Sequence, residues 1–134
     1  MSVIVTDAGF GADDWTGGFA APDAVQAGQG VDIGSDADPA ALPEAVLSAP
    51  VIRVAFPSFS DGRGFTIARA LRRAGFGGRL CAAGHVIADQ YAMARRSGFD
   101  EVEISEDLAA RQPVQQWRAR ADWRAHDYQA RLRA

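Results

Sequence analysis

The sequence has one cysteine, no lysine and no long apolar run. The single cysteine, Cys81, excludes an internal disulfide and any zinc or iron–sulfur site that needs several cysteines. The absence of lysine excludes a phosphate-binding loop, because that motif uses a lysine against the nucleotide phosphates. No stretch approaches the roughly 20 apolar residues that span a bilayer, and the N-terminus shows no secretory signal. We therefore expect a cytoplasmic protein without a membrane partner.

Positive charge is missing from the first 50 residues, which hold eight acidic side chains. The remaining residues hold fourteen arginines and nine acidic side chains. Arginine binds oxyanions through two parallel hydrogen bonds, so this second part favours contact with a small anion. The net charge of −3 argues against broad nucleic-acid binding.

Common cofactor and metal motifs are also missing. Gly-x-Gly triplets, such as those that begin at residues 9, 28 and 62, are not followed by the third glycine of a dinucleotide fingerprint. Asp36 and Asp38 stand close together, and we prefer a capped turn to Mg²⁺ ligation for this pair. No cofactor and no metal site is recognisable from the residues.

The length of 134 residues predicts one domain that buries roughly two-thirds of its unfolded surface. Strand and helix patterns alternate within a βα core at 31–110. The expected strands are 31–33, 51–56, 79–83 and 101–104, and the expected helices are 39–48, 64–74 and 86–97. The order βαβαβαβ predicts an α/β fold, with a small parallel sheet of about four strands and flanking helices. We interpret the apolar run at 51–56 as a strand buried on both faces.

Two further segments flank this core. Residues 1–30 are rich in Gly, Asp and Ala, and we expect an irregular segment with a short edge strand at 2–6 and one hairpin. Residues 113–133 place apolar side chains at helical spacing, which predicts a C-terminal amphipathic helix. Trp123 lies off its apolar stripe. Such a helix packs either on its own domain or on a partner chain.

Two expected helices end alike, with Arg72-Arg73-Ala74-Gly75-Phe76 and, 23 residues later, Arg95-Arg96-Ser97-Gly98-Phe99. Arginines in a last turn interact favourably with the helix dipole. A glycine after that turn adopts the left-handed conformation that stops a helix, and the next apolar residue folds back on it. We prefer this local explanation of the double arginines to contact with a partner.

Ligands of open parallel sheets bind beyond the carboxyl ends of the strands. Three loops meet that condition, at 57–63, 84–85 and 105–107. The candidate anion-binding residues are Ser58, Asp61, Gly62, Arg63, Gly64, Gly84 and Gln90. Helix N-termini with free N–H groups follow the first two loops and favour an anion. The alternative is structural, with Asp61 capping the helix and Arg63 paired to Asp61 or Asp89.

His85 and Asp89 share one face of the expected helix at 86–97. A carboxylate beside an imidazole raises the imidazole pKa and sets up acid–base chemistry, so these two are the candidate catalytic residues. The alternative is an exposed aspartate with a capping histidine. For Cys81, within a strand, we expect a buried and inert thiol.

The segment FPSFSDGRGF, the DQ pair at 89–90 and the RSGFD motif at 96–100 together resemble the bacterial family called domain of unknown function 934. The resemblance covers residues 51–104 well and the flanking parts loosely. The matching residues are Asp61, Gly62, Arg63, Gly64, Asp89 and Gln90. Many relatives have lysine at the position of Ser58 and an acidic residue at that of His85. The resemblance implies a link to assimilatory sulfite reductase, and it implies an oxidoreductase label without a visible redox motif.

Three hypotheses follow. The first is an accessory protein of sulfite reduction that binds the haem subunit of the reductase, or its electron donor, and holds a small oxyanion at 61–64. The second is an enzyme acting on an anionic substrate with Arg63, His85 and Asp89. The third is a non-catalytic structural homodimer. We prefer the accessory protein.

Overall fold

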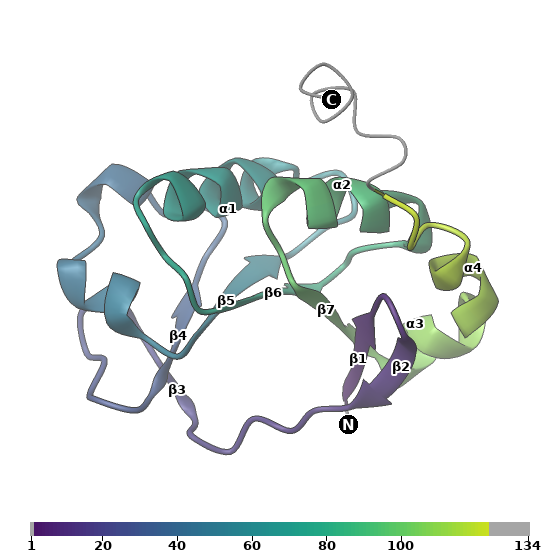
Figure 1. Ribbon diagram of the computed structural model, residues 1–134, viewed down its shortest axis with the longest axis horizontal. Helices are drawn as coiled ribbons and strands as arrows, with labels where there is room; N and C mark the ends of the chain where they lie inside the picture. The colour runs from purple at the N-terminus through teal and green to yellow at the C-terminus, as the bar shows by residue number, and fades with distance from the viewer. Residues whose placement is uncertain (1, 124–134) are drawn as a thin grey trace.

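The computed structural model describes residues 2–123, which contain one seven-stranded sheet (Figure 1). Its strands are β1 (Ser2–Thr6), β2 (Gly9–Ala12), β3 (Phe19–Ala20), β4 (Gly30–Ile33), β5 (Val51–Phe56), β6 (Arg79–Gly84) and β7 (Glu101–Ser105). The order across the sheet is β2-β1-β7-β6-β5-β4-β3. Strands β3 to β7 are parallel, and β1 is antiparallel to both β2 and β7.

The helices are α1 (Arg63–Arg73), α2 (Tyr91–Ser97), α3 (Glu106–Arg111) and α4 (Val114–Arg118), and three 3-10 turns are η1 (Pro39–Ala41), η2 (Glu44–Ser48) and η3 (Ala88–Gln90). Within the part of the chain that the structure describes, no helix has the length and apolarity needed to cross a bilayer.

The predicted α/β class and the parallel strands β4 to β7 are confirmed, but the sheet has more strands than expected. The three additional strands, β1 to β3, come from the first 20 residues, where a strand at 2–6 and one hairpin were expected. The prediction that 2–6 forms an edge strand is wrong, because β2 pairs with the outer side of β1. At the opposite edge of the sheet, the two-residue strand β3 pairs in parallel with β4.

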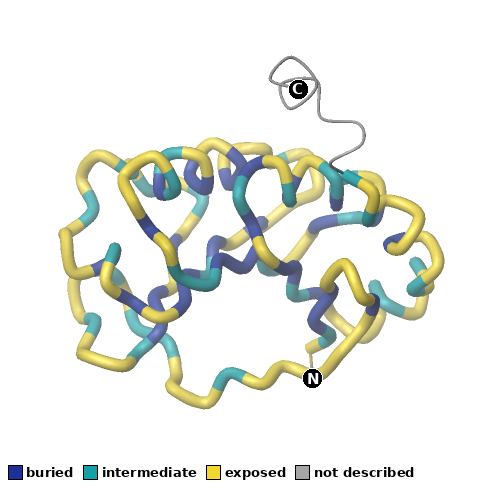
Figure 2. The backbone as a smooth tube through the Cα atoms, in the orientation of Figure 1, coloured by how far each residue is buried: buried dark blue, intermediate teal, exposed yellow. Residues whose placement is uncertain are grey.

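Strands β4 to β7 lie side by side in chain order. Because parallel crossovers are right-handed, this order places α1 and α2 on the same face of the sheet, as Figure 1 shows. The strand residues that face these helices are buried (Figure 2). They are Val31, Ile33, Ile52, Val54, Phe56, Leu80, Ala82, Val102 and Ile104.

The opposite face of the sheet differs from the prediction that β5 is buried on both sides. Here Arg53 is partly exposed and Ala55 is exposed. The segment between β2 and β3 runs along this side (Figure 1). Asp14, from that segment, pairs with Arg79 at 2.8 Å, and the guanidinium of Arg53 lies 3.8 Å from the ring centroid of Phe19. One face is therefore apolar and covered by helices, and the other carries charge.

Two of the expected helices begin or end at other residues. The expected helix at 39–48 is two 3-10 turns, because Pro43 stands between them. Asp38 caps the first turn as predicted, since its side chain accepts a hydrogen bond from the Ala40 amide at 3.0 Å. In the expected helix at 86–97, regular α-structure starts only at Tyr91.

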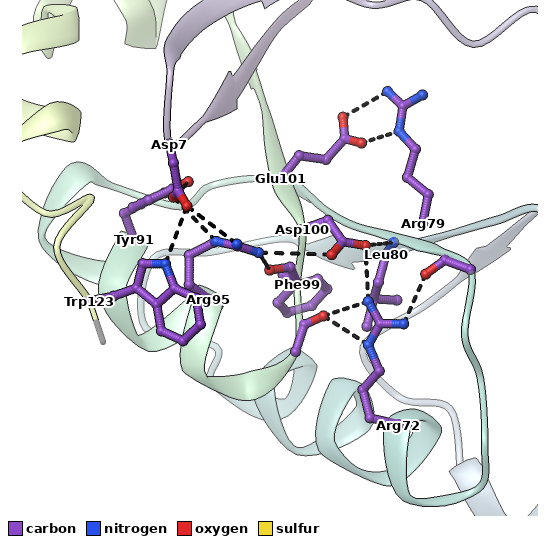
Figure 3. Close-up of polar contacts among 12 residues, drawn as sticks. Asp7, Arg72, Arg79, Leu80, Tyr91, Arg95, Phe99, Asp100, Glu101 and Trp123 are labelled. Carbon is purple, nitrogen blue, oxygen red and sulfur yellow. Dashed lines mark hydrogen bonds and ion pairs between the residues drawn. The ribbon is translucent and has the colours of Figure 1, made fainter. Parts of the chain in front are cut away.

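The predicted helix at 113–133 is confirmed only at its start, because α4 ends at Arg118 and residues 119–123 are not helical. Residues 124–133, with His126, lie outside the described residues. Trp117 belongs to the core of its own domain, with an exposed fraction of 1% and a hydrogen bond from Nε1 to the Gln112 carbonyl at 2.9 Å. Trp123 contacts Arg95 through its ring and Asp7 through Nε1 (Figure 3).

The predicted helix endings are confirmed. Gly75 and Gly98 have φ angles of +104° and +114°. The amides of the following phenylalanines fold back, from Phe76 to the Leu71 carbonyl and from Phe99 to the Ala94 carbonyl. Figure 3 shows Arg72 and Arg95 directed toward Asp100, which lies between the two helix ends.

Candidate functional site

The three loops that were expected to carry chemistry meet around one cavity of about 330 Å³. We call it the rim cavity, and its lining residues are Phe59, Gly84, His85, Ser105, Asp107, Leu108 and Arg111. Each of the loops 57–63, 84–85 and 105–107 contributes to it. It lies at the carboxyl ends of β5, β6 and β7, which is where open parallel sheets bind ligands.

His85 is held in the rim cavity by contacts on two sides. Its ring stands edge-on to Phe59, with centroids 5.2 Å apart and an interplanar angle of 90°. Its Nδ1 lies 3.3 Å from the carbonyl oxygen of Phe56. A carbonyl only accepts hydrogen bonds, so this contact requires a proton on Nδ1 and leaves Nε2 for a ligand.

Gly84 allows the chain to turn into this position. Its φ angle is +115°, and a Cβ there would lie 2.7 Å from the Phe56 carbonyl oxygen. Only glycine adopts this conformation without strain. The glycine at position 84 of the predicted site is therefore explained by the backbone conformation and not by contact with a ligand.

Arg111 supplies a cation that the sequence analysis missed. It lines the rim cavity, and its side chain forms no hydrogen bond or ion pair with any residue from 2 to 123. Ser105 caps α3 by accepting a hydrogen bond from the Leu108 amide at 3.2 Å, so its own O–H remains a donor. The sequence did contain a signal for Arg111. It stands four residues, about one helical turn, after Asp107 of the third loop, so both side chains are expected on the same face of a helix.

The expected free N–H groups after the second loop are already bonded, which corrects that part of the anion hypothesis. The His85 amide donates to the Phe56 carbonyl at 2.9 Å. The Ile87 amide donates to Gln90 Oε1 at 3.0 Å, and the Ala88 amide donates to Gln112 Oε1 at 2.7 Å. These three amides are therefore not free to bind an anion in the rim cavity.

Gln90 joins two of the loops around the rim cavity. While Oε1 accepts from the Ile87 amide, Nε2 donates to the Phe59 carbonyl at 2.8 Å. Both ends of the side chain are used, so its contacts in this structure are those of a positioning residue rather than a ligand.

The Asp61–Gly64 turn is closed on itself. Arg63 donates to both carboxylate oxygens of Asp61, at 2.9 and 2.8 Å, and to Ser35 Oγ at 3.0 Å. These hydrogen bonds from Arg63 hold the pKa of Asp61 well below its ordinary value. Ser58 bonds Ser60 at 2.9 Å through the hydroxyl oxygens.

The two glycines of this turn have structural positions. Gly62 is the residue that precedes α1. A Cβ at Gly64 would lie 2.7 Å from Phe56 Cε1, so the close packing of α1 on β5 requires a glycine there. Arg63 lines a separate cavity of about 260 Å³ between η1 and α1.

The enzyme hypothesis placed Arg63, His85 and Asp89 around one substrate, and the structure does not bring these three residues together. Arg63 and His85 line different cavities. Asp89 is exposed and pairs with Arg120 at 2.8 Å. Cys81 is buried as expected, and burial raises the pKa of its thiol. Residues 2–123 contain no group of three or more His, Cys, Asp or Glu side chains placed to hold a metal ion.

The fold is thus a mixed α/β sheet with a cavity at its rim that is lined in part by Arg111. A family model described as "Bacterial protein of unknown function (DUF934)" matches residues 30–134, and the chain belongs to this family. No curated protein and no solved structure matches the chain. The family description assigns no activity, substrate or partner.

Proposed function

We propose that the protein is an accessory protein of sulfite reduction that binds a small oxyanion in the rim cavity. The observation that carries the oxyanion site is Arg111, a guanidinium that lines this cavity and has no partner among residues 2–123. The Ser105 hydroxyl supplies a further donor on the same cavity. Guanidinium groups bind oxyanions with charge-assisted hydrogen bonds.

The rim cavity is a better oxyanion site than the Asp61–Gly64 turn. An anion at the turn would compete with the Asp61 carboxylate, which already accepts two hydrogen bonds from Arg63. In the rim cavity the one carboxylate, Asp107, forms no ion pair with Arg111. A bound oxyanion therefore displaces no internal partner of the arginine.

The accessory role fits a chain in which His85 and Asp89, the candidate acid–base pair, form no hydrogen bond or ion pair with each other in the described structure. Asp89 is engaged by Arg120, so the enzyme hypothesis loses the carboxylate that it placed beside His85. The hypothesis of a structural dimer assumed that a second copy covers the sheet. The segment between β2 and β3 partly covers that face, so less of the sheet is left for a second copy to cover. Light scattering tests the oligomeric state.

Titration of the full chain with sulfite and sulfate, followed by calorimetry, tests the oxyanion site. Arg111→Gln should weaken sulfite binding about tenfold, because a hydrogen bond to a charged group contributes about 1.5–3 kcal/mol. Arg69→Gln is the matched control, since Arg69 is an exposed arginine on α1 away from the cavity. Equal affinities in the two variants would remove the proposed site.

A deletion strain grown with sulfate as its sulfur source tests the accessory role. We expect slower growth on sulfate, normal growth on cysteine, and rescue by the wild-type gene but not by the Arg111→Gln gene. Salt-sensitive co-purification with the haem subunit of the reductase, or with its electron donor, would identify the partner. Unchanged growth on sulfate after deletion would contradict this role.

A further inference from the structure

A second cavity, of about 530 Å³, lies on the sheet face opposite α1 and α2. We call it the sheet-face cavity, and its lining residues are Asp32, Ile33, Gly34, Arg53, Ala55, Ala83, Gly84 and Glu103. Within this cavity β6 contributes only the small residues Ala83 and Gly84, which lie between Arg53 of β5 and Glu103 of β7. Its volume lies within the range of about 300–1,000 Å³ that small-molecule sites occupy.

The charged groups of this cavity are unequally paired. Arg53 makes two short hydrogen bonds to the Asp32 carboxylate, at 2.6 and 2.8 Å. The same guanidinium reaches across β6 to Glu103, where both oxygens lie 3.4 Å from Nη1. The one guanidinium thus pairs with two carboxylates, and its contacts with Asp32 are shorter than those with Glu103.

Glu103 is the carboxylate that remains under-compensated. Its side chain is 16% exposed. Burial raises its pKa above the ordinary value, and Arg53 opposes this effect without cancelling it. A partly buried carboxylate with one long ion pair gains when a second cation reaches it.

The chemistry of the lining excludes other ligand classes. A bound anion would meet two carboxylates and a guanidinium that is already engaged. A metal ion would need more oxygen ligands than Asp32 and Glu103 supply, and residues 2–123 contain no group of three acidic, His or Cys residues suited to one. The methyl groups of Ala55 and Ala83 offer an apolar floor for a carbon chain.

We propose that the sheet-face cavity binds a small organic cation, with the Glu103 carboxylate holding its ammonium or guanidinium group and Ala55 and Ala83 contacting its apolar stem. A small molecule is favoured over a protein surface because the segment between β2 and β3 is tethered along the same face. The segment is held there by the Asp14–Arg79 ion pair and, where it enters β3, by the contact of Arg53 with Phe19. This site is independent of the oxyanion proposed for the rim cavity.

Isotope-labelled full-length protein should be titrated with n-butylguanidine and n-butylamine at constant ionic strength. Butanol and butyrate are the neutral and anionic controls. We expect saturable shifts of the Gly34, Ala55 and Ala83 amide signals with the two cations and none with the controls. Equal shifts with butanol, or cation shifts confined to rim-cavity residues, would overturn the proposal.

Glu103→Gln should weaken binding of both cations about tenfold, since it removes the charge and keeps the shape. Glu106→Gln, an exposed glutamate on α3 outside the cavity, should leave the affinity unchanged. If Glu103→Gln folds poorly, Ala55→Leu fills the cavity from an exposed position and should abolish binding. The proposal fails if neither cavity variant binds more weakly than wild type, or if a lysine-rich peptide binds through Glu103 while both small cations do not.

Discussion

The guanidinium of Arg72, in the last turn of α1, donates two hydrogen bonds to the carbonyl of Gly98, which ends α2. These bonds are 3.0 and 2.8 Å long. The same group donates to the carbonyls of Phe76 and Gly78. It also donates to the carboxylate of Asp100 (Figure 3). One side chain therefore joins the ends of two helices to the residues that lead into β6 and β7.

Arg72→Ala should lower the free energy of unfolding by about 2–3 kcal/mol, because several carbonyls and a carboxylate lose their donor. Urea denaturation followed by circular dichroism measures this change. Arg73→Ala is the matched control, since Arg73 is exposed and should change stability by no more than about 0.5 kcal/mol. Equal losses would show that the double arginines act through helix propensity or the dipole alone.

Local signals explain why the helix endings were predicted. Glycine and phenylalanine after a double arginine specify a helix stop within five residues, and both stops are present. The strands β4 to β7 were predicted for a similar reason, because each is a short β-rich run between helical patterns. The start of α2 was missed because side chains of Gln90 and Gln112 hold the preceding turn, and periodicity does not show such contacts.

The polar face of the sheet was missed because its contacts join residues far apart in the sequence. Arg53 meets Asp32 and Glu103 only when β4, β5, β6 and β7 align, and β6 contributes small residues that no pattern marks as a hollow. The candidate site was predicted in part, since its three loops do meet at the rim cavity. The side chains that line the cavity were not all predicted, because Arg63 and Asp89 are held elsewhere by ion pairs with Asp61 and Arg120.

Gln90→Ala should lower stability by about 1–2 kcal/mol, because the Ile87 amide and the Phe59 carbonyl both lose a partner. It should also change the amide signals of the loops 57–63 and 84–85. Chemical denaturation and a two-dimensional amide spectrum measure the two effects. Gln115→Ala, at an exposed glutamine of α4, serves as control and should do neither. An unperturbed spectrum for Gln90→Ala would show that the amide does not position these loops.

Asp61 should make the free energy of unfolding decrease as the pH is lowered. Its pKa in the folded protein is lowered from 3.8 by the hydrogen bonds from Arg63. A lowered folded pKa stabilises the fold above the unfolded value, and this contribution is lost as the pH falls from about 4 through the folded pKa. Asp61→Asn should therefore lose less stability than wild type between pH 4 and pH 2. Thermal unfolding across this range measures the difference.

Asp23→Asn gives the comparison for this pH series, because Asp23 is an exposed aspartate without a hydrogen bond or ion pair among residues 2–123. It should follow the wild-type curve. Arg63→Gln should resemble Asp61→Asn, because it removes the donor that lowers the pKa. If all variants lose stability in parallel on acidification, the Asp61–Arg63 pair contributes nothing to the acid response.

Trp117 packs α4, the start of the C-terminal segment, against the core. The ring is 1% exposed and stands edge-on to Tyr91, with centroids 6.0 Å apart. Truncation of a buried aromatic side chain costs about 3–5 kcal/mol, because burial is lost and a cavity remains. Trp117→Ala should lower the free energy of unfolding by this amount, as measured by urea denaturation.

Trp117→Phe separates packing from hydrogen bonding at the same position. It keeps an aromatic ring against Tyr91 and loses the N–H that donates to the Gln112 carbonyl, so we expect a loss of about 1–2 kcal/mol. Met93→Ala, at a side chain that is 45% exposed, should change stability by less than about 1 kcal/mol. A loss for Trp117→Ala no larger than that for Met93→Ala would mean that α4 is not packed on the sheet domain in solution. The aromatic face of α4 would then be free for a partner chain, as the alternative reading of this segment requires.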